Sequence, residues 1–549
     1  MQNIPIKSIN YLNKKLVNVF YFFDKRRPII FFLLAFSYLL IYFLQDFSSQ
    51  SLIAHDEGLY ARRSRLVEES SNWFSSPFSD PHHKTIGSYW FIALSIKFLG
   101  DSELALRLPS FFFSVLCLIL TYHIALKITN KKSALISVFS LSSMPIWIQY
   151  TRYASPDFPF LFCILSIIFS FLQFLSSTEN IRKYFYIFTS GLFIPIAFFI
   201  RSYMAFVPVF GLIPFLCFNL YRSKKIFSSF FFTGILFGSL PTFLNFYYSY
   251  KNFGIKGISI LFDFAKKQAI GGDFFDNFLY LPFKYIYFTF PVGILFFILI
   301  VFTRNNNIIK YPLLSYYYPF SSLSILLCMS TSYPHYYLFL LPPLSILFSY
   351  RIQSFSFRFS FSKSYIKYLL IFLILILCCA LVSLLFYYQD YLIDYSYRNT
   401  SIIYLPILLL FVMLLYSLKF LFESRYRPFD LLKFFFTIIS SQYLSISILY
   451  NFGVIGNPNF QIKSFLSNSL VSSISNSNTI YLFNVDSKIE TLLSYYLPSS
   501  KIIKSSNNIA MYNFIITSDK EFLYSVKNQS LYKSIKTFNS HYLLMKISK

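Results

Sequence analysis

Long apolar runs follow one another along most of this 549-residue chain. Each run is close to the length of about 20 residues with which a helix crosses a hydrocarbon layer of ~30 Å. Only 13% of the residues are charged and 56% are hydrophobic, which is far more apolar than a soluble globular domain. We therefore predict a polytopic α-helical membrane protein with about thirteen spans. The predicted spans are residues 29–46, 104–126, 132–149, 157–175, 184–200, 203–220, 227–249, 285–303, 312–330, 334–350, 369–388, 401–421 and 431–450.

Lysines and arginines gather in every second loop between these runs. Because short basic loops stay in the cytoplasm, their alternation places the basic N-terminal arm there as well. The basic loops also account for the net charge of +26. We therefore expect no nucleic-acid partner. The basic loops carry Lys127/Lys131/Lys132, Arg182/Lys183, Arg222/Lys224/Lys225, Arg304/Lys310, Arg351/Arg358/Lys363/Lys367 and Arg425/Arg427/Lys433.

Two of the opposite, external loops are long, and loops of such length are more often functional than idle. The first covers residues 47–103 and contains two amphipathic stretches, 59–69 and 88–99, which we expect to form short helices in the membrane interface. The second covers residues 250–284.

The composition changes after the last apolar run, because no later stretch is long enough to span and Ser and Asn become frequent. Short β-like stretches at 479–485, 513–517 and 542–547 alternate with helix-like ones at 487–496 and 519–526. We expect a membrane domain over 1–455 and a small soluble, external α/β domain over 456–549.

Ionisable side chains return repeatedly to the external ends of the predicted spans. The adjacent carboxylates Asp56 and Glu57 follow the first span, and Lys84 lies further along the same loop. Ionisable residues at such positions usually face the protein interior or a wet cavity, and they are functional by default. Cations there can hold a phosphate, and a carboxylate can take a proton from an attacking hydroxyl, which suits an anionic, lipid-linked substrate. The later members of this set are Asp157, Arg201 and His335.

Several local motifs resemble the bacterial aminoarabinose lipid A transferases and the related dolichyl-phosphate-mannose mannosyltransferases, which are C-type (GT-C) glycosyltransferases using polyprenyl-phosphate sugars. The order and spacing of these motifs match over most of the membrane part. The motifs are Asp56-Glu57-Gly58-Leu59-Tyr60-Ala61, Arg65, Asn72-Trp73, Pro77, Lys84, Tyr89-Trp90, Phe98-Leu99-Gly100, Arg107-Leu108-Pro109, Arg152 to Asp157, Arg201, and Tyr333 to Leu338 with Pro342.

The resemblance implies an inverting glycosyltransferase of a bacterial inner membrane, with a polyprenyl-phosphate sugar donor, a lipid or glycan acceptor and membrane lipids as its partners. It makes Asp56 the catalytic base or the carboxylate that orients the acceptor, and Asp157 the second essential carboxylate. Lys84 and Arg201 would clamp the donor phosphate. Arg65 would order the loop by pairing with Glu57 or Asp157. The remaining substrate-binding residues that it implies are Glu57, Tyr60 and His335.

The chain departs from the family pattern at three places. Leu59 stands where the family has Arg, Thr85-Ile86 where it has two prolines, and His83 where it has Glu. The sugar and the acceptor can therefore differ from aminoarabinose and lipid A, and a divalent metal stays open as a cofactor. The adjacent His82 and His83 are a poor metal pair, because neighbouring residues on a regular element point apart.

Other functions remain as alternatives. A polyprenyl-lipid transporter or flippase would need polar groups near the middle of the spans, where this sequence has almost none. A non-catalytic membrane scaffold that presents residues 463–549 is a third reading. Within the enzyme class, an oligosaccharide ligase remains open beside a monosaccharide transferase.

Overall fold

The computed structural model describes mainly the middle of the chain and parts of its C-terminal segment. The chain divides after Asp46 into two compact units, and every described residue lies in the second, 47–549. The described ranges are 50–222, 226–269, 274–302, 316–331, 333–356, 431–451, 479–497, 501–503, 514–519, 532–538 and 541–546, with a few positions at 408–416, 462–463 and 521–522.

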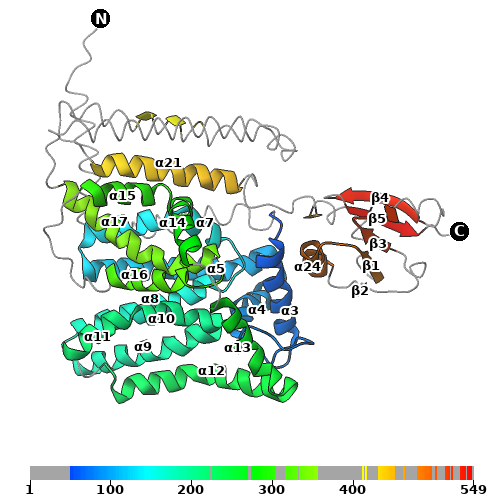
Figure 1. Cartoon of the computed structure of the whole chain (residues 1–549), viewed down its shortest axis with the longest axis horizontal. Coiled ribbons are helices and arrows are strands. Elements are labelled where there is room, and N and C mark those ends of the chain that lie inside the picture. Colours follow the sequence, from blue (N-terminus) through cyan, green and yellow to red (C-terminus); the bar gives the residue numbers. More distant parts are fainter. Residues whose placement is uncertain are drawn as a thin grey trace, which may run out of the picture. The chain divides into compact units, whose positions relative to one another are not determined.

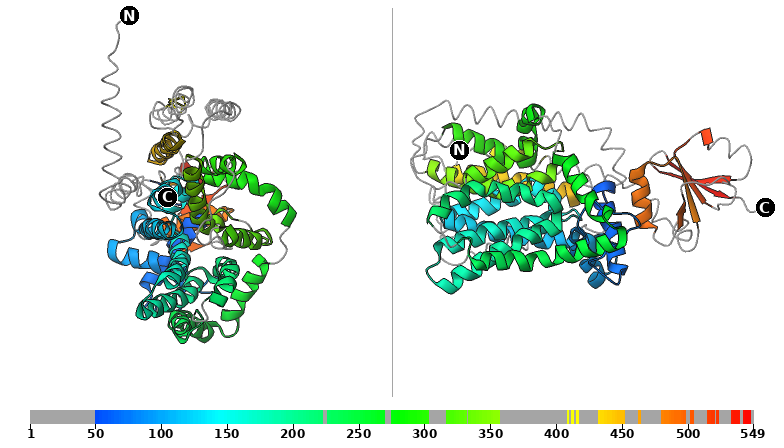
Figure 2. Two further views of the ribbon diagram at one scale, coloured as in Figure 1. Left: turned by 90° about the vertical axis from the view of Figure 1, so that its left-hand side faces the viewer. Right: turned by 60° about the horizontal axis from the view of Figure 1, so that its bottom comes forward.

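Four long apolar helices form the centre of the described part: α5 (Glu103–Ile128), α8 (Asp157–Ser176), α9 (Asn180–Arg201) and α12 (Ser229–Phe253). They pack in the order α5, α8, α9, α12, and α9 lies beside α12 in Figure 1 and in the right-hand view of Figure 2. By length and composition, these four helices, with α9 continued to Gly211, can cross a membrane. They correspond to predicted spans.

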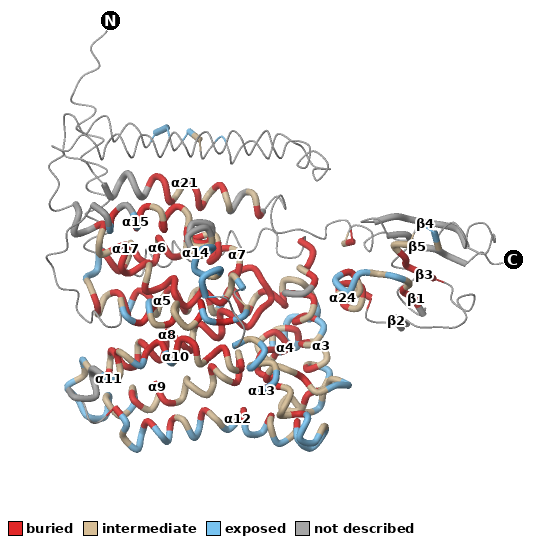
Figure 3. The backbone as a smooth tube through the Cα atoms, in the orientation of Figure 1, coloured by how far each residue is buried: buried red, intermediate tan, exposed pale blue. Residues whose placement is uncertain are grey.

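Burial separates the inner from the outer helices of this group. In α8, 78% of the apolar stretch is buried within the protein, whereas in α12 the share is 28%. Figure 3 accordingly shows α8 mostly buried and α12 largely exposed or intermediate. An apolar helix with an exposed apolar surface suits a lipid environment.

Other predicted spans are broken into shorter helices. The span predicted at 132–149 is α6 (Lys131–Ser142) followed by α7 (Pro145–Thr151). Met144 is extended, as expected of a residue before proline, so α6 cannot continue through it. The span at 203–220 is η2 (Ser202–Ala205), α10 (Phe206–Gly211) and α11 (Ile213–Arg222).

The later helices differ more from the prediction at their ends. The span at 285–303 is covered by α14 (Phe274–Thr289), which begins earlier, and α15 (Val292–Phe302). The remaining spans match α16 (Tyr318–Leu327), η4 (Pro334–Leu340) with α17 (Leu341–Ser356), and α21 (Leu431–Asn451). The spans at 29–46 and 369–388 and nearly all of 401–421 lie outside the described residues, so the number of spans stays a prediction.

The first predicted external loop folds into a short π-helical turn, η1 (Ala54–Gly58), and two helices, α3 (Leu59–Glu69) and α4 (Gly87–Leu99). This confirms the two helices predicted there. The two helices pack against each other, and the rings of Tyr60 and Tyr89 meet at 5.6 Å between centroids. The second predicted external loop contains α13 (Lys256–Ala269) and the start of α14.

The C-terminal segment contains a five-stranded mixed sheet and one helix, α24 (Ser487–Tyr496). The strands are β1 (Thr479–Phe483), β2 (Lys501–Ile503), β3 (Phe514–Thr517), β4 (Tyr532–Phe538) and β5 (His541–Lys546), in the order β2-β1-β3-β5-β4. β1 is parallel to β2 and β3, and β5 is antiparallel to β3 and β4. β2 and β4 were not predicted, and most of the helix predicted at 519–526 lies outside the described residues.

One apolar core joins the first loop to the C-terminal segment. Buried side chains of α3 and α4, such as Ala61 and Ile92, belong to the same cluster as Leu492 of α24 and Ile516 of β3. Both α3 and η1 contact α24. The turn that carries the acidic pair is therefore held between the membrane helices and the C-terminal segment.

Candidate active site

Four of the residues singled out from the sequence form one chain of contacts. Lys84 Nζ and Arg201 Nη1 each donate a hydrogen bond of 2.9 Å to the same acceptor, the phenol oxygen of Tyr60. Arg201 Nη2 also pairs with Asp157 Oδ1 at 2.7 Å. These residues come from α3, from the loop before α4, and from the ends of α8 and α9. Of the four residues expected to gather in one pocket, Lys84, Asp157 and Arg201 thus lie together, and the side chain of Asp56 lies outside the described residues.

Polar contacts between the start of α4 and the end of α9 hold the two cations at this distance. Thr85 follows Lys84, and its backbone N–H donates to Ser202 Oγ at 3.0 Å. Three residues on, Ser88 Oγ donates to the carbonyl of Ile200 at 2.7 Å. Ser202 has a φ of 51°, which turns the chain sharply after Arg201. The loop that carries Lys84 is thus fixed to the helix that carries Arg201.

A glycine allows the two helices to approach this closely. A Cβ atom on Gly87 would lie 2.5 Å from the carbonyl oxygen of Phe199 and 2.5 Å from its ring. No larger side chain fits here without moving α4 away from α9.

The site carries excess positive charge. Burial disfavours ionisation of Tyr60, but the attraction of Lys84 and Arg201 outweighs it, so the pKa of the Tyr60 phenol lies below its usual value. Asp157 supplies one negative charge against the two cations. The arrangement therefore suits an anion with at least one negative charge.

Asp56 lies in η1, three residues before Leu59, where α3 begins. Its side chain is outside the described part of the structure, so its predicted role as the base stays a prediction. The anchoring of its neighbour, Glu57, fixes the turn in which Asp56 lies.

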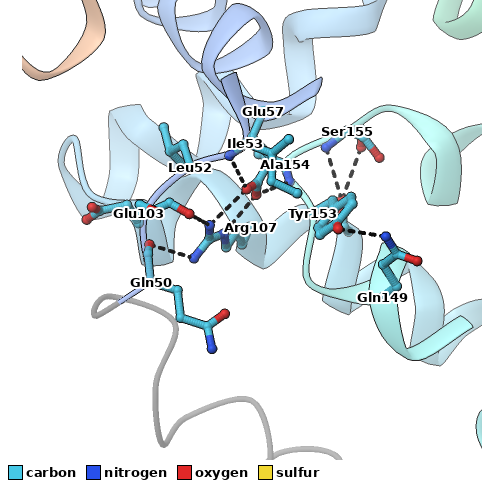
Figure 4. A network of polar contacts seen from close by, with 12 residues as sticks. Gln50, Leu52, Ile53, Glu57, Glu103, Arg107, Gln149, Tyr153, Ala154 and Ser155 are labelled. Atoms are coloured by element: carbon cyan, nitrogen blue, oxygen red, sulfur yellow. Dashed lines mark hydrogen bonds and ion pairs between the residues drawn. The ribbon is translucent and has the colours of Figure 1, made fainter. Parts of the chain in front are cut away.

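Glu57 forms a buried ion pair with Arg107, which the sequence analysis assigned no role (Figure 4). Arg107 Nε and Nη2 bind the two carboxylate oxygens at 2.8 and 2.9 Å. The same oxygens accept hydrogen bonds from the backbone N–H groups of Ile53 and Ala154, both at 3.0 Å. Glu57 is fully buried. We expected it to bind substrate, but its oxygens are occupied by the protein itself, and it fastens η1 to α5 and to the loop before α8.

Arg65 does not pair as predicted. It forms an ion pair with Asp101, donates to the carbonyl of Tyr495 at 3.0 Å, and its guanidinium lies 4.4 Å from the centre of the Tyr495 ring. Arg65 lies five positions after Tyr60 on α3, about 140° around the helix, so it cannot face the same cluster. The predicted pairing with Glu57 or Asp157 is wrong, and Arg65 instead contacts α24.

His335 lies in η4, within electrostatic range of Arg201 and Lys84. Its ring meets those of Tyr150 and Tyr336, at 5.8 and 4.5 Å between centroids. Tyr336 is a residue that the sequence analysis did not single out, although it lies within the late motif. Its hydroxyl accepts a bond of 3.3 Å from Gln268 of α13, and it lies within electrostatic range of Arg201.

The two neighbouring histidines of the first loop have separate partners. His82 shares a hydrogen bond of 2.6 Å with the hydroxyl of Tyr89, and the His83 ring lies against Phe264 of α13. Burial, with the charges of Arg63, His83 and Lys84, lowers the pKa of His82 to about 2, so its imidazole is neutral.

Among the described side chains, no three His, Cys, Asp or Glu residues come close enough together to hold a metal ion. The described side chains therefore do not form a metal site.

Comparison with known proteins supports the resemblance seen in the motifs. Residues 83–248 match the family described as dolichyl-phosphate-mannose-protein mannosyltransferase. An uncharacterized protein of Aquifex aeolicus is 32% identical over 136 residues, which are 24% of this chain and 27% of that protein. The undecaprenyl phosphate-alpha-4-amino-4-deoxy-L-arabinose arabinosyl transferase of Yersinia pestis is 33% identical over 103 residues, 18% of each chain. The matched segments thus span less than a third of these relatives.

The fold is also that of a solved transferase. ArnT from Cupriavidus metallidurans aligns with a TM-score of 0.71 in its apo state and 0.72 when bound to undecaprenyl phosphate, at 13% identity. The two alignments cover 94% and 95% of this chain and 97% and 99% of ArnT. Together these findings show a family match over residues 83–248 and the polytopic helical fold of ArnT.

Proposed function

We propose that this chain, a polytopic protein of the C-type glycosyltransferase fold, moves a sugar from a polyprenyl-phosphate donor to a lipid or other envelope acceptor at the external face of a bacterial inner membrane. One observation carries the proposal: the cations of Lys84 and Arg201 converge at 2.9 Å on a single oxygen, in a site that is largely buried. Arg and Lys side chains that converge on one point bind phosphate oxygens through charge-assisted hydrogen bonds. The relatives named above, one of them bound to undecaprenyl phosphate, support a donor of this class.

In the proposed reaction, the bond between the anomeric carbon and the phosphate oxygen breaks. Its electron pair goes to the phosphate, and the leaving polyprenyl phosphate gains negative charge beside Lys84 and Arg201. Because this charge develops in the transition state, stabilising it lowers the barrier rather than only tightening substrate binding.

The acceptor hydroxyl forms the new bond from the opposite face of the sugar, which inverts the anomeric configuration. Its proton passes to Asp56, the carboxylate that we assign as general base. We assign Asp157 a positioning role, because its contact of 2.7 Å with Arg201 sets the direction of that guanidinium. Asp157 is therefore essential through Arg201 rather than as a second base.

An apolar cavity between α9, η2, α10 and α12 suits an isoprenoid chain. It has a volume of about 210 Å³, and its lining includes Phe198 and Ala205, which precede and follow Arg201 in the sequence. A polyprenyl donor needs such a surface within reach of the groups that hold its phosphate.

A transporter is the second candidate function, and the charge distribution argues against it. In the four long helices, Asp, Glu, Lys and Arg occur only within the first or last two turns. A path for a charged headgroup through the membrane needs polar groups near the middle of the spans. The described helices present none of these charged residues there.

The proposal is tested by turnover of a radiolabelled polyprenyl-phosphate sugar with purified protein and an envelope-lipid extract as acceptor. Wild-type protein should release polyprenyl phosphate and label an acceptor, whereas Asp56→Asn should do neither while eluting as a folded protein. Asp80→Asn is the matched control, because Asp80 is an exposed carboxylate in the same loop. A fully active Asp56→Asn protein would show that another group is the base.

A further inference from the structure

The oxygen between the two cations belongs to the protein itself. Both Lys84 Nζ and Arg201 Nη1 are the donors in their bonds to Tyr60, so the phenol oxygen accepts twice, as an anion would. A phosphate oxygen that took both bonds would have to lie where this phenol oxygen lies now. Tyr60 and a phosphate therefore compete for the same N–H groups.

The Tyr60 ring is held for this contact. It is only 6% exposed, lies against the ring of Tyr89, and has the ammonium of Lys84 4.7 Å from its centre. The cations also lower the pKa of the phenol against the effect of burial, which reflects their electrostatic attraction for its oxygen. The contact is thus a built feature of the site.

We propose that the Tyr60 hydroxyl is an internal competitor of the lipid phosphate: the donor displaces it from Lys84 and Arg201, and its return releases the product polyprenyl phosphate. This inference rests on the proposed function and assigns Tyr60 a role different from the substrate contact that the family resemblance implies. Because Lys has three donors and Arg has five, the exchange proceeds one N–H at a time and never leaves both cations without a partner.

The charges of donor and product explain why such a competitor is useful. A sugar phosphodiester carries one negative charge, whereas a phosphate monoester carries about 1.5 to 2 near neutral pH. The product is therefore bound more tightly by the two cations than the donor, and without a competitor it would stay in the site. Tyr60 takes no part in the bonds that form and break in the reaction. The proton of the acceptor hydroxyl still passes to Asp56.

The test is the affinity for undecaprenyl phosphate, the product analogue, measured on full-length protein in detergent for the wild type and Tyr60→Phe. Loss of one competing hydroxyl should tighten binding by about 3- to 10-fold, as expected for a hydrogen-bonding term of ~1 kcal/mol. Dissociation of undecaprenyl phosphate should also become slower. A dissociation constant does not depend on the fraction of protein that is folded, so partial misfolding does not obscure the result.

Tyr186→Phe is the matched control, because Tyr186 lies near the other end of α9 and takes no part in the cation site. It should bind undecaprenyl phosphate like the wild type. Weaker or unchanged binding by Tyr60→Phe would overturn the inference, since it would mean that the hydroxyl grips the phosphate or is irrelevant to it. That outcome leaves the proposed function intact, whereas a wild-type protein that binds no undecaprenyl phosphate removes both.

Discussion

At the scale of single residues, the ion pair of Glu57 and Arg107 anchors the η1 turn, in which Asp56 lies. Both side chains are buried, and between them they bind backbone groups of residues 50, 51, 53 and 154. Removing one partner of a buried pair leaves the other charge without compensation, which costs about 3 to 5 kcal/mol. An exposed pair contributes about 0 to 1 kcal/mol.

We accordingly expect Arg107→Ala to lower the unfolding temperature sharply and to abolish transfer, measured by thermal unfolding in detergent and by the turnover assay. Arg182→Ala is the control, because Arg182 forms an exposed ion pair with Glu179. If both variants unfolded at nearly the same temperature, the ion pair of Glu57 and Arg107 would not have the structural role described above.

The buried His82 makes stability depend on pH. Its pKa is about 2 in the folded protein, against an ordinary value near 6.5, so below pH 6.5 the unfolded chain binds a proton that the folded chain does not. Stability should therefore fall as the pH drops from 6.5, by up to about 1.4 kcal/mol per pH unit from this group. His82→Gln should show a shallower decline in unfolding temperature between pH 6.5 and 4.5. An equally steep decline would assign the effect to other groups.

At the scale of elements, the close approach of α4 to α9 sets the distance between the two cations. Gly87 is the residue that permits it. Gly87→Ala should push α4 away from Phe199, separate Lys84 from Arg201, and reduce affinity for polyprenyl phosphate by tenfold or more. Ser95→Ala is the control, because it also introduces an alanine into α4. It removes a hydroxyl that has no hydrogen-bond partner. It should leave that affinity unchanged, and equal effects of the two variants would contradict this account.

At the scale of the whole molecule, the described part of the C-terminal segment contacts η1 and α3 through α24. The Tyr495 hydroxyl donates to Asp101 at 3.0 Å, and Asp101 also pairs with Arg65 of α3. The backbone N–H of Leu52, just before η1, donates to the Tyr496 hydroxyl at 3.1 Å. The described part of the C-terminal segment thus borders the turn that carries Asp56.

From this we expect Asp101→Ala to lower kcat several-fold while leaving the affinity for polyprenyl phosphate unchanged, because Asp101 links α3 to α24, which borders the η1 turn, and its described side-chain contacts are with Arg65 and Tyr495. Turnover and binding assays on the same preparation separate the two quantities. Glu179→Ala, which removes an exposed carboxylate far along the chain, serves as the control. A loss of phosphate affinity in Asp101→Ala would mean that α24 also supports the cations.

Periodic sequence patterns predicted well the bounds of helices that have a regular amphipathic repeat. The helices at 59–69 and 487–496 have the predicted bounds, because their apolar faces repeat with the helical period. The breaks at Ser143–Met144 and before Val292 were missed, because apolar content continues through them while proline interrupts the helix. β2 and β4 are short or polar and are recognisable only through their pairing with β1 and β5.

The site was predictable as a set of residues but not as a set of contacts. Lys84, Asp157 and Arg201 were placed together because they share one end of the predicted spans. The pairing of Glu57 with Arg107, 50 positions away, and of Arg65 with Asp101 depends on tertiary packing that no spacing encodes.

The most direct test of the account is the binding of undecaprenyl phosphate to the wild type and to Lys84→Met. Lys97→Met is the control, because Lys97 lies at the far end of α4 above the Trp73 ring. Removing a charged hydrogen-bond donor from a phosphate should weaken binding at least tenfold. We predict that loss for Lys84→Met and none for Lys97→Met. Equal affinity of Lys84→Met and the wild type would contradict the assignment of the cation pair as the phosphate site.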